Sequence, residues 1–562
     1  MVLVVRLTGI VLSLVGAVVA QHSGGSGRGG QGPAGSGHGS AGNNRGPGGG
    51  HPIAQPAVFP LEFRSIDGHG NNLQNPSWGA AEVAMLRTLG SDYADSTGSP
   101  SGSNRASARE ISNLVAASPG SILSPRRASD FVWQWGQFLD HDLVETPGVW
   151  PGEAFDIAVP LGDAWFDPFL TGTQTIPMNR SGYEMVKGVR QQVNFITALI
   201  DASNVYGSDA ERQDALRTLD GTGRLLTSAD DMLPFNVHGL PNAGGTSSTL
   251  FLAGDVRANE QIALTAMHTV FVREHNAWAG IVGDALPGLS GDDIYELARC
   301  VVAAEMQAIT YREFLPVLLG RDALADYRGY RPSVDPGISN AFATAAYRVG
   351  HTMLSPQLLR LDAYGQPHPL GPLPLANAFF DPQVLLATGI DPVLRGLAAQ
   401  RAQAIDPFVV DDVRNFLFGP AGSGGFDLAA LNIQRGRDHG LPSYNDMREA
   451  TGHPRAQRFT DLHPDPLIAS RLSQAYASVD DIDPWVGLLA ERPAPGALVG
   501  RTLRAILGDQ FERARDGDRF WYEVYLPTTM VEFVNNQTLA VIIRRNTGIG
   551  AELPDDVFRV PQ

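Results

Sequence analysis

The spacing of apolar residues constrains the fold of this chain more than any other feature. In several long stretches, apolar side chains recur every three or four positions, which is the period of an α-helix. The pattern predicts helices in SDFVWQWGQFLDHDLV (129–144), QQVNFITALIDA (191–202), EQIALTAMHTVFVREHNAWAGIV (260–282), DDIYELARCVVAAEMQAITYREFL (292–315) and ISNAFATAAYRVGHTML (338–354). Alternating strand patterns are scarce, so we expect an all-α fold with little β structure.

The single cysteine limits how such a fold can be stabilised. Cys300 has no partner for an intramolecular disulfide in a chain of 562 residues. A chain of this length exceeds the usual size of one hydrophobic core, and its stability must come from packing or from bound ligands. We expect one large helical domain, residues 56–562, that forms around a cofactor.

The N-terminal region predicts export. Residues 1–20 combine Arg6, an apolar run and a small-residue cleavage site, which is typical of a signal peptide. The apolar run is too short to span a bilayer comfortably, so no stable membrane insertion is expected. Residues 21–55 are rich in glycine, serine and proline and predict a disordered linker. The formal net charge of −17 argues against a nucleic-acid partner.

Two aspartates flank a histidine in WGQFLDHDLV. Projected on a helix at about 100° per residue, Gln137, Asp140 and His141 share one face, whereas Asp142 points elsewhere. One face therefore offers a histidine, an amide and a carboxylate to a ligand, and the other offers a carboxylate to a second partner. The alternative is a helix end at which both carboxylates are solvated.

Hard oxygen donors lie close together in TALIDAS. Thr197, Asp201 and Ser203 carry side-chain oxygens, and Leu199 offers a backbone carbonyl. Such donors suit calcium better than zinc or iron. Taken alone, the same residues are typical of helix caps, and the calcium interpretation gains weight only if Asp142 joins them.

Three further segments carry polar residues whose ordinary interpretations are structural. Arg257 and Glu260 in GDVRANEQ have the spacing of a surface ion pair. Arg348 and His351 in AYRVGHTMLSP lie on an apolar helix, where a lone histidine is usually a hydrogen-bonded core residue. The segment LNIQRGRDHGLPSYN, which contains Asn432, is too polar to be explained by helix packing.

Taken in order, these segments resemble the animal-type haem peroxidase superfamily, which includes myeloperoxidase-like and peroxidasin-like members. The likeness extends from RSIDGHGNNLQNPSWGAA (64–81) to RDGDRFWYE (515–523). The disulfides of the secreted animal members are absent here, and in this respect the chain resembles a bacterial-type member. The resemblance implies a haem b derivative and calcium as cofactors.

The resemblance also implies a role for each candidate residue. In the haem pocket, His141 would be the distal histidine, Gln137 its neighbour, Arg257 the distal arginine and His351 the axial iron ligand. Asn432 would hydrogen-bond that ligand, Arg348 would meet a haem propionate, and Asp140 and Glu260 would form ester bonds to the haem. Calcium would be held by Asp142, Thr197, Leu199 through its carbonyl, Asp201 and Ser203. Gln261 replaces the methionine that forms a third haem link in myeloperoxidase, so that link is not expected.

The implied function is a secreted peroxidase. Such an enzyme reduces hydrogen peroxide through a ferryl intermediate and oxidises iodide, bromide, thiocyanate or phenolic donors. One alternative is a fatty-acid dioxygenase of the same superfamily, which would use a tyrosine three residues before the axial histidine; Arg348 occupies that position, and Tyr347 should point about 100° away on a helix. The other is a non-enzymatic, calcium-stabilised adhesion or matrix protein, which would show no haem absorption.

Overall fold

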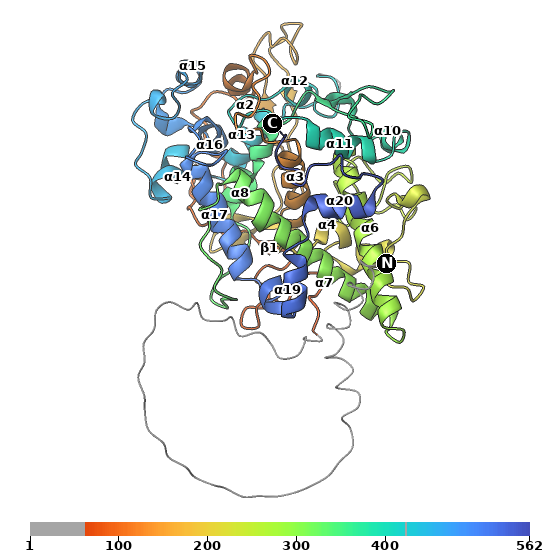
Figure 1. Cartoon of the computed structure of the whole chain (residues 1–562). Coiled ribbons are helices and arrows are strands. Elements are labelled where there is room, and N and C mark those ends of the chain that lie inside the picture. The colour runs from red at the N-terminus through yellow and green to blue at the C-terminus, as the bar shows by residue number, and fades with distance from the viewer. Residues whose placement is uncertain (1–61, 422–423, 562) are drawn as a thin grey trace, which may run out of the picture.

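The fold is mainly helical, as the apolar spacing predicts, and is described by a computed structural model for residues 62–421 and 424–561 (Figure 1). The predicted signal peptide, the linker and the first residues of the predicted domain lie outside the described residues. Among the residues described, none of the helices combines the length and apolarity needed to cross a bilayer.

The helices differ widely in length. The longer ones are α3 (Phe131–Leu143), α6 (Ile262–Ala285), α7 (Gly291–Ile309), α11 (Asp391–Ala399), α13 (Leu428–Asp438), α15 (Pro466–Ala475), α17 (Arg501–Asp516) and α20 (Leu539–Asn546). The shorter ones are α2 (Ala108–Ile111), α4 (Ser203–Tyr206), α5 (Ala210–Leu216), α8 (Leu315–Leu318), α9 (Asn340–Thr344), α10 (Pro382–Leu386), α12 (Asp411–Arg414), α14 (Tyr444–Ala450), α16 (Pro484–Ala490), α18 (Tyr522–Tyr525) and α19 (Thr528–Val534).

Tighter and wider turns connect them. The 3₁₀ segments are η2 (Ala229–Asp231), η4 (Ala346–Thr352), η5 (Leu375–Asn377), η6 (Phe459–Asp461) and η7 (Val479–Asp481), and the π-helical segments are η1 (Ser112–Ala116) and η3 (Thr310–Phe314). The strands form small antiparallel sheets: β1 (Val83–Ala84), β5 (Val189–Asn194) and β4 (Tyr183–Val186) in that order, β2 (Ile157–Ala158) with β3 (Thr175–Ile176), and β6 (Gln357–Leu358) with β7 (Leu373–Pro374).

Helix α3 lies in the middle of the molecule (Figure 1). Its sequence is apolar on nearly every side, and a helix of that kind is buried. Ten of its 13 residues are buried. The three that are not, Gly136, Gln137 and Asp140, all line one internal cavity. The open face of this helix is therefore the face that carries the candidate site.

The helix predicted for residues 191–202 is wrong. Strand β5 occupies its first part and pairs antiparallel with β4, so that Tyr183 lies opposite Gln192. The two strands are joined at Lys187 and Gly188, which both have positive φ, 51° and 81°. Consecutive positive φ values are the mark of a hairpin turn whose twist matches the strands. The hairpin therefore overrides the weak helical pattern of QQVNFITALIDA.

The helix predicted for residues 338–354 is interrupted. Helix α9 ends at Thr344. The backbone of the next residue, Ala345, leaves the helical region with φ −125° and ψ −57°, and the chain continues as the 3₁₀ segment η4. A 3₁₀ helix has three residues per turn, so residues three apart, such as Arg348 and His351, lie on one face. Tyr347, Arg348 and His351 all line the same cavity as α3, so Tyr347 does not point away from it as the α-helical projection predicts.

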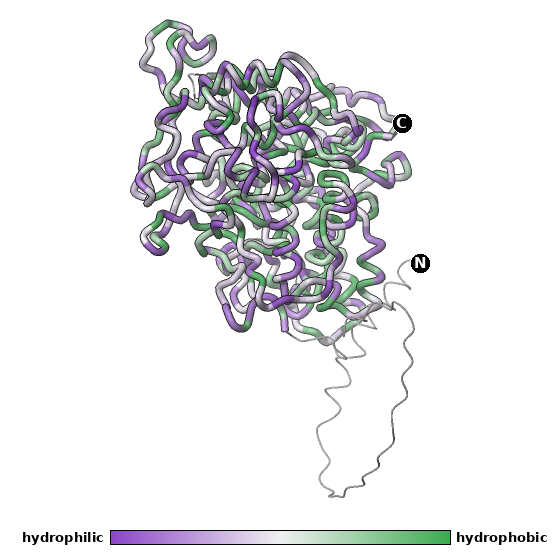
Figure 2. Tube along the Cα trace, turned by 90° about the vertical axis from the view of Figure 1, so that its left-hand side faces the viewer, coloured by the Kyte–Doolittle hydropathy of each residue, from purple (hydrophilic) through white to green (hydrophobic). Residues whose placement is uncertain are grey.

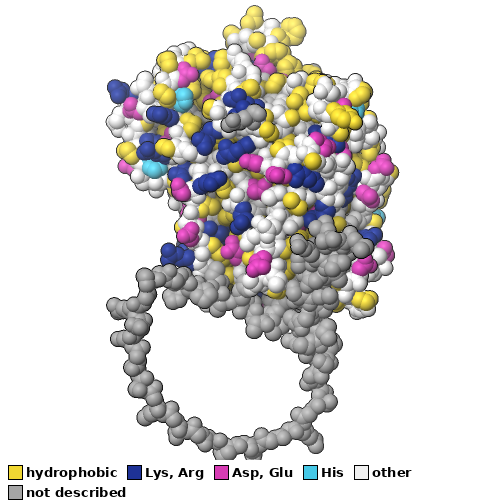
Figure 3. Space-filling model, viewed as in Figure 1, with side chains coloured by type: hydrophobic (Ala, Val, Ile, Leu, Met, Phe, Trp, Pro, Cys, Tyr) yellow, Lys and Arg dark blue, Asp and Glu magenta, His cyan; other side chains and the backbone are white. Residues whose placement is uncertain are grey.

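Buried apolar side chains from Met85 to Phe558 form one continuous core cluster. Apolar and polar stretches alternate along the trace and are not separated into different halves of the molecule (Figure 2). On the face shown in Figure 3, basic and acidic side chains are interspersed. The negative net charge is thus not gathered into a single acidic area on that face.

Candidate active site

A cavity of about 460 Å³ lies between α3, η4 and the loop that precedes α6. Such a volume falls within the range of about 300–1,000 Å³ that is usual for cofactor sites. The predicted haem-pocket residues that line it are Gln137, Asp140, His141, Arg257, Glu260, Arg348 and His351. Segments more than 200 residues apart in the sequence therefore contribute to one chamber.

His141 enters this cavity from α3 and is held neutral. Its side chain is buried, with Nδ1 3.4 Å from Asp255 Oδ1 and Nε2 3.9 Å from Glu260 Oε2. Burial, followed by the nearby Arg257 charge, lowers the pKa of His141 well below its usual value. An uncharged imidazole at neutral pH can accept a proton from a molecule bound in the cavity.

Asp255 fixes Arg257 and was missed by reasoning from sequence. The Arg257 guanidinium donates to both carboxylate oxygens, at 2.9 Å and 2.7 Å, and the Arg257 backbone N–H donates to Oδ1 at 2.8 Å. Burial raises the pKa of Asp255, but the charge of Arg257 and its hydrogen bonds outweigh that effect and hold the pKa below its usual range. The only sequence signal was an aspartate two residues before an arginine, a pattern common in ordinary turns.

Two carboxyl groups face the same space. Burial raises the pKa of Asp140 to about 6 and that of Glu260 to about 7. Arg257 lies 3.7 Å from Asp140, and Gln137 Nε2 donates to Glu260 Oε2 at 3.1 Å. Both groups therefore exist partly as neutral acids near pH 7, and both are available to a ligand that fills the cavity.

Gln261 supports the Gln137 side chain. Its Nε2 donates to Gln137 Oε1 at 3.0 Å and to Gln134 Oε1 at 2.6 Å, and its Oε1 accepts the Ala263 N–H at 2.7 Å. The last bond is an N-cap of α6, which satisfies one of the free donors at the helix start. The residue that replaces the expected methionine thus has a structural role of its own.

On the η4 side of the cavity, His351 contacts Asn432. The amide Nδ2 of Asn432 lies 2.8 Å from His351 Nδ1, and Arg348 donates to Asn432 Oδ1 at 2.9 Å. A guanidinium can only donate, so it holds the amide oxygen towards Arg348 and the amide nitrogen towards His351. His351 Nδ1 is then an acceptor. Burial, with a contribution from Arg348, lowers the pKa of His351 to about 3, which keeps the ring uncharged.

Arg348 is a half-buried cation that makes no ion pair within the described part of the chain. Burial, followed by repulsion from Arg435, lowers its pKa to about 10. Burying a charge without a partner costs much free energy, and Arg348 lines the cavity. An anionic group on a bound ligand would offset that cost.

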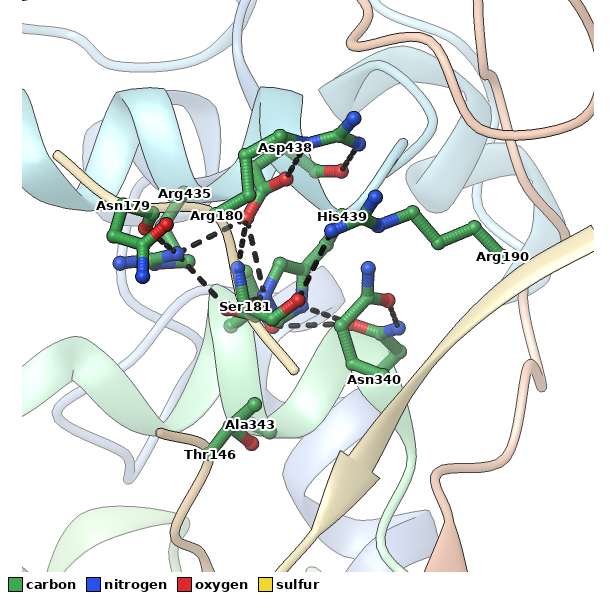
Figure 4. Close-up of polar contacts among 12 residues, drawn as sticks. Thr146, Asn179, Arg180, Ser181, Arg190, Asn340, Ala343, Arg435, Asp438 and His439 are labelled. Carbon is green, nitrogen blue, oxygen red and sulfur yellow. Dashed lines mark hydrogen bonds and ion pairs between the residues drawn. The ribbon is translucent and has the colours of Figure 1, made fainter. Parts of the chain in front are cut away.

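Arg435, which lines the cavity, is held by a polar network (Figure 4). Arg435 donates to Ser181 Oγ at 2.9 Å and to Asp438 Oδ2 at 3.0 Å. His439 Nε2 lies 2.7 Å from the same Ser181 oxygen, and its Nδ1 lies 2.7 Å from Asn340 Oδ1. The network explains the polar segment LNIQRGRDHGLPSYN and adds Arg435, Ser181 and His439 to the cavity wall, none of which sequence reasoning assigned.

The residues predicted to hold calcium gather on the other side of α3. Asp142 Oδ1 accepts a hydrogen bond from Ser203 Oγ at 2.9 Å, and Asp201 Oδ1 accepts one from Thr197 Oγ1 at 3.0 Å. Leu199 is buried in the same turn. Burial, followed by repulsion from Asp201, raises the pKa of Asp142 well above its usual value.

In the described part of the chain, the buried carboxylate of Asp201 also lacks some of the hydrogen bonds that would offset the cost of its burial. Its Oδ2 atom is buried and makes no hydrogen bond among the described residues, and the nearest cation, Arg64 Nε, lies 4.0 Å away. Burial raises the pKa of Asp201 as well. Two buried carboxylates with neighbouring hydroxyl oxygens have the chemistry of a calcium site.

These observations define a class of protein. A cavity of this size, with a neutral histidine and a fixed arginine beside a second histidine and a half-buried cation that makes no ion pair among the described residues, has the groups of a haem-dependent oxidoreductase of the peroxidase type. Residues 63–558 match the family described as animal haem peroxidase. The chain belongs to that family.

Known relatives and a solved structure support the same family assignment. The chain is 36% identical to peroxinectin A of Dictyostelium discoideum over 523 residues, covering 89% of this chain and 96% of that protein. It is 37% identical to the mouse peroxidasin homolog over 564 residues, but spans only 38% of that longer protein. The structure of peroxidase A from Dictyostelium discoideum superposes with a TM-score of 0.84 at 34% identity, covering 89% of this chain and all of the other.

A fatty acid alpha-dioxygenase from Arabidopsis thaliana shares the fold. Its structure superposes with a TM-score of 0.74 at 20% identity and covers 89% of this chain and 83% of the other. At that identity the likeness concerns the fold alone.

Proposed function

We propose that this chain is a secreted haem peroxidase that reduces hydrogen peroxide to water and oxidises iodide, bromide, thiocyanate or phenolic donors. The observation that carries the proposal is that the His141–Arg257 pair and His351 line one cavity. Haem, when bound there, supplies an iron centre that binds peroxide and accepts its two oxidising equivalents. The predicted signal peptide supports secretion.

His141 and Arg257 divide the work on peroxide between them. Neutral His141 takes the proton from one peroxide oxygen and returns it to the other, which leaves as water. Arg257, held by Asp255 in a fixed orientation, stabilises the negative charge that develops on the departing oxygen. Gln137 is the third polar side chain of this wall, and the hydrogen bond from Gln261 keeps it in place.

The η4 side would hold the cofactor. For Nε2 of His351 to bind iron, its Nδ1 must carry the proton, so the Asn432 amide must turn over and present its oxygen. Arg348 would then be released from that oxygen and free to meet a propionate, which would supply the anion that its charge lacks among the described residues. Arg435 lines the same cavity and suits the second propionate.

Asp140 and Glu260 are the proposed sites of covalent attachment. Both carboxyl groups line the cavity, and their raised pKa values keep a fraction of each neutral near pH 7. An ester bond to the haem edge would remove the charge of the carboxylate altogether. The attachment would therefore remove the free-energy cost of desolvating two charged carboxylates, which is the cost that raises both pKa values.

Calcium is proposed between Asp142, Thr197, Leu199, Asp201 and Ser203. The support is the buried carboxylate pair and the Asp201 oxygen that lacks a hydrogen bond. Because Asp142 follows His141 directly on α3, a cation here would fix the position of the imidazole. Catalysis by proton transfer depends on such fixed geometry.

Small anions remain suitable donors despite the net charge of −17. Salt screens distant charges over about 8–10 Å at physiological ionic strength, and the Arg257 guanidinium lies inside the cavity. The experiment mixes haem-loaded protein with hydrogen peroxide and then with each donor in a stopped-flow spectrometer. We expect the unaltered, haem-loaded chain to consume peroxide and His141→Ala to lose this activity. A haem-loaded chain that leaves peroxide intact would contradict the proposal.

Fatty-acid oxygenation is the alternative, because Tyr347 lines the cavity and its hydroxyl makes no hydrogen bond among the described residues. Peroxidase function is favoured because the predicted oxygenase position is Arg348, which cannot form a tyrosyl radical. Oxygen uptake with an unsaturated fatty acid distinguishes the two. Uptake that is abolished by Tyr347→Phe would favour the oxygenase.

A further inference from the structure

A second pocket, of about 410 Å³, is separate from the cavity proposed to hold haem, the haem cavity, and has an aromatic wall. Tyr311, Tyr327 and Trp521 all line it. Tyr311 and Tyr327 are half-buried, so their rings are open to a molecule in the pocket, whereas Trp521 is buried behind them. Tyr311 lies in the π-helical turn η3, a feature that often marks functional sites.

A continuous series of aromatic rings joins this pocket to the haem cavity. Tyr347, on the cavity wall, has its ring centroid 5.6 Å from that of Phe511 on α17. Phe511 lies 6.1 Å from Tyr311, and Tyr311 lies 4.8 Å from Trp521. Trp521 in turn lies 5.8 Å from Tyr327. One phenylalanine ring therefore separates the cavity tyrosine from the pocket tyrosine.

The composition of this series suits electron transfer. Tyrosine and tryptophan are the side chains most easily oxidised by one electron, and phenylalanine is not. Electron tunnelling weakens steeply with distance, so several short steps between contacting rings carry an electron much faster than one long step. Phe511 thus only bridges the gap, while Tyr347, Tyr311 and Trp521 can each hold the oxidising equivalent in turn.

We propose that the pocket lined by Tyr311, Tyr327 and Trp521 is a second oxidation site, at which phenolic donors too large for the haem cavity deliver electrons through the aromatic series. The inference rests on the proposed peroxidase function, since reaction with peroxide supplies the oxidising equivalents.

The reaction balances. Each donor loses one electron and its phenolic proton, so that its O–H bond breaks and a phenoxyl radical leaves. Two electrons from two donors pass inwards, and two protons are taken up from solvent. One hydrogen peroxide is thereby reduced to two water molecules, and its O–O bond is broken.

The charges around the pocket favour a neutral donor. Arg312, Arg321 and Arg515 line it together with Asp326 and Glu523. Arg515 is paired with Asp516 at 2.8 Å, so neither sign dominates. Small anions gain no electrostatic advantage at this site, in contrast to the haem cavity with Arg257. A phenol group carried on a larger molecule fits both the mixed charge and the aromatic wall.

The test compares two donors in haem-loaded protein. Iodide is small enough for the cavity, and a phenol joined by a short linker to dextran is too large to enter it. The variants are Tyr311→Phe with Tyr327→Phe, and the same pair with Trp521→Phe added. Tyr327→Phe removes a hydroxyl that makes no hydrogen bond among the described residues. Tyr311→Phe removes one hydrogen bond, to the Phe511 carbonyl, which costs about 1 kcal/mol, so the double variant should fold even if the buried tryptophan change does not. Tyr364→Phe, at an 88% exposed tyrosine outside the series, is the matched control.

Oxidation of dextran-linked phenol should be lost in the variants, while iodide oxidation keeps its rate and Tyr364→Phe changes neither. Protein treated with peroxide alone and a nitroso spin trap should carry the trap on peptides that contain Tyr327 or Trp521. Unchanged oxidation of dextran-linked phenol, or trap adducts confined to other residues, would overturn the inference. Loss of iodide oxidation in the unaltered chain would instead indicate that the peroxidase function itself is wrong.

Discussion

Replacing Asp255 by asparagine should disable the His141–Arg257 side of the cavity and leave the His351 side intact. The carboxylate makes two charge-assisted hydrogen bonds to the Arg257 guanidinium, at 2.9 Å and 2.7 Å, and such bonds contribute about 1.5–3 kcal/mol each. Asparagine can accept only one of them, and its amide N–H₂ would face the other guanidinium nitrogen. Breaking a buried ion pair in this way costs about 3–5 kcal/mol.

The cost should lie near the lower end of that range. Arg257 has a second carboxylate, Asp140, at 3.7 Å, and its side chain is 18% exposed. The guanidinium would turn towards Asp140 and leave the place where it stabilises the departing oxygen. Loss of one preorganised donor of this kind slows a reaction by about 10²–10³-fold, and we expect that reduction in the rate constant with peroxide.

A pH profile separates this effect from general damage. The Asp255 charge raises the pKa of His141, opposing the lowering caused by burial and by Arg257. Without that charge the pKa of His141 falls further. Because protonation of His141 stops it from accepting a proton, the acid limb of the pH profile should move to lower pH in Asp255→Asn.

The assay is stopped-flow mixing of haem-loaded protein with peroxide across a range of pH, after the Soret band and thermal unfolding have confirmed that the variant folds and binds haem. Asp509→Asn, which removes a half-exposed carboxylate paired with Arg513 on α17, is the control. An unchanged rate constant and acid limb in folded, haem-loaded Asp255→Asn would refute the reasoning.

Four further changes test other parts of the site. After exposure to peroxide, acidified solvent should extract haem from Asp140→Asn with Glu260→Gln but not from the unaltered chain; equal extraction from both would contradict the esters. Arg348→Met should lower haem affinity in a titration followed at the Soret band, since the propionate loses its cation, and equal affinity would argue against that contact. Removing calcium with a chelator should lower the unfolding temperature of the unaltered chain but not of Asp142→Asn; equal shifts would exclude this site. Burial raises the pKa of Glu313 to about 8 from 4.5, so its contribution to folding is full below pH 4.5 and is lost as the pH rises through about 8. Because Glu313 is partly exposed, Glu313→Gln should stabilise the chain by only about 1–2 kcal/mol above pH 8 in denaturant unfolding, with no difference near pH 4.5.

The sequence was most informative where one helix carries several tasks. The apolar period of residues 129–144 predicts α3, and rotation by 100° per residue assigns Gln137, Asp140 and His141 to one face and Asp142 to another. The structure has the first three on the cavity and Asp142 beside Ser203. A regular helix makes such angles calculable from residue number alone.

Reasoning from sequence failed where the backbone is irregular. The pair Lys187 and Gly188 closes a hairpin that no apolar period reveals, and residues 191–194 become a strand. Asp255 lies outside any helix, so its direction towards Arg257 depends on a turn. Arg435 depends on contacts with Ser181, which lies 254 residues away. Tertiary contacts of this range leave no local signal.

The change from α-helix to 3₁₀ helix before His351 has a chemical consequence. A 3₁₀ helix has three residues per turn, so residues three apart lie on one face. In η4 this places Arg348 on the same face as His351, and both line the cavity together with Tyr347. Arg348 then supplies the charge that an anionic cofactor needs. Tyr347 contacts Phe511 at the start of the aromatic series. In a regular α-helix Arg348 and His351 would lie about 60° apart around the axis. Gly350→Ala, whose Cβ would meet only Trp133 at 3.8 Å, favours that helix and should therefore lower haem affinity in a titration followed at the Soret band; unchanged affinity in the folded variant would contradict this reasoning.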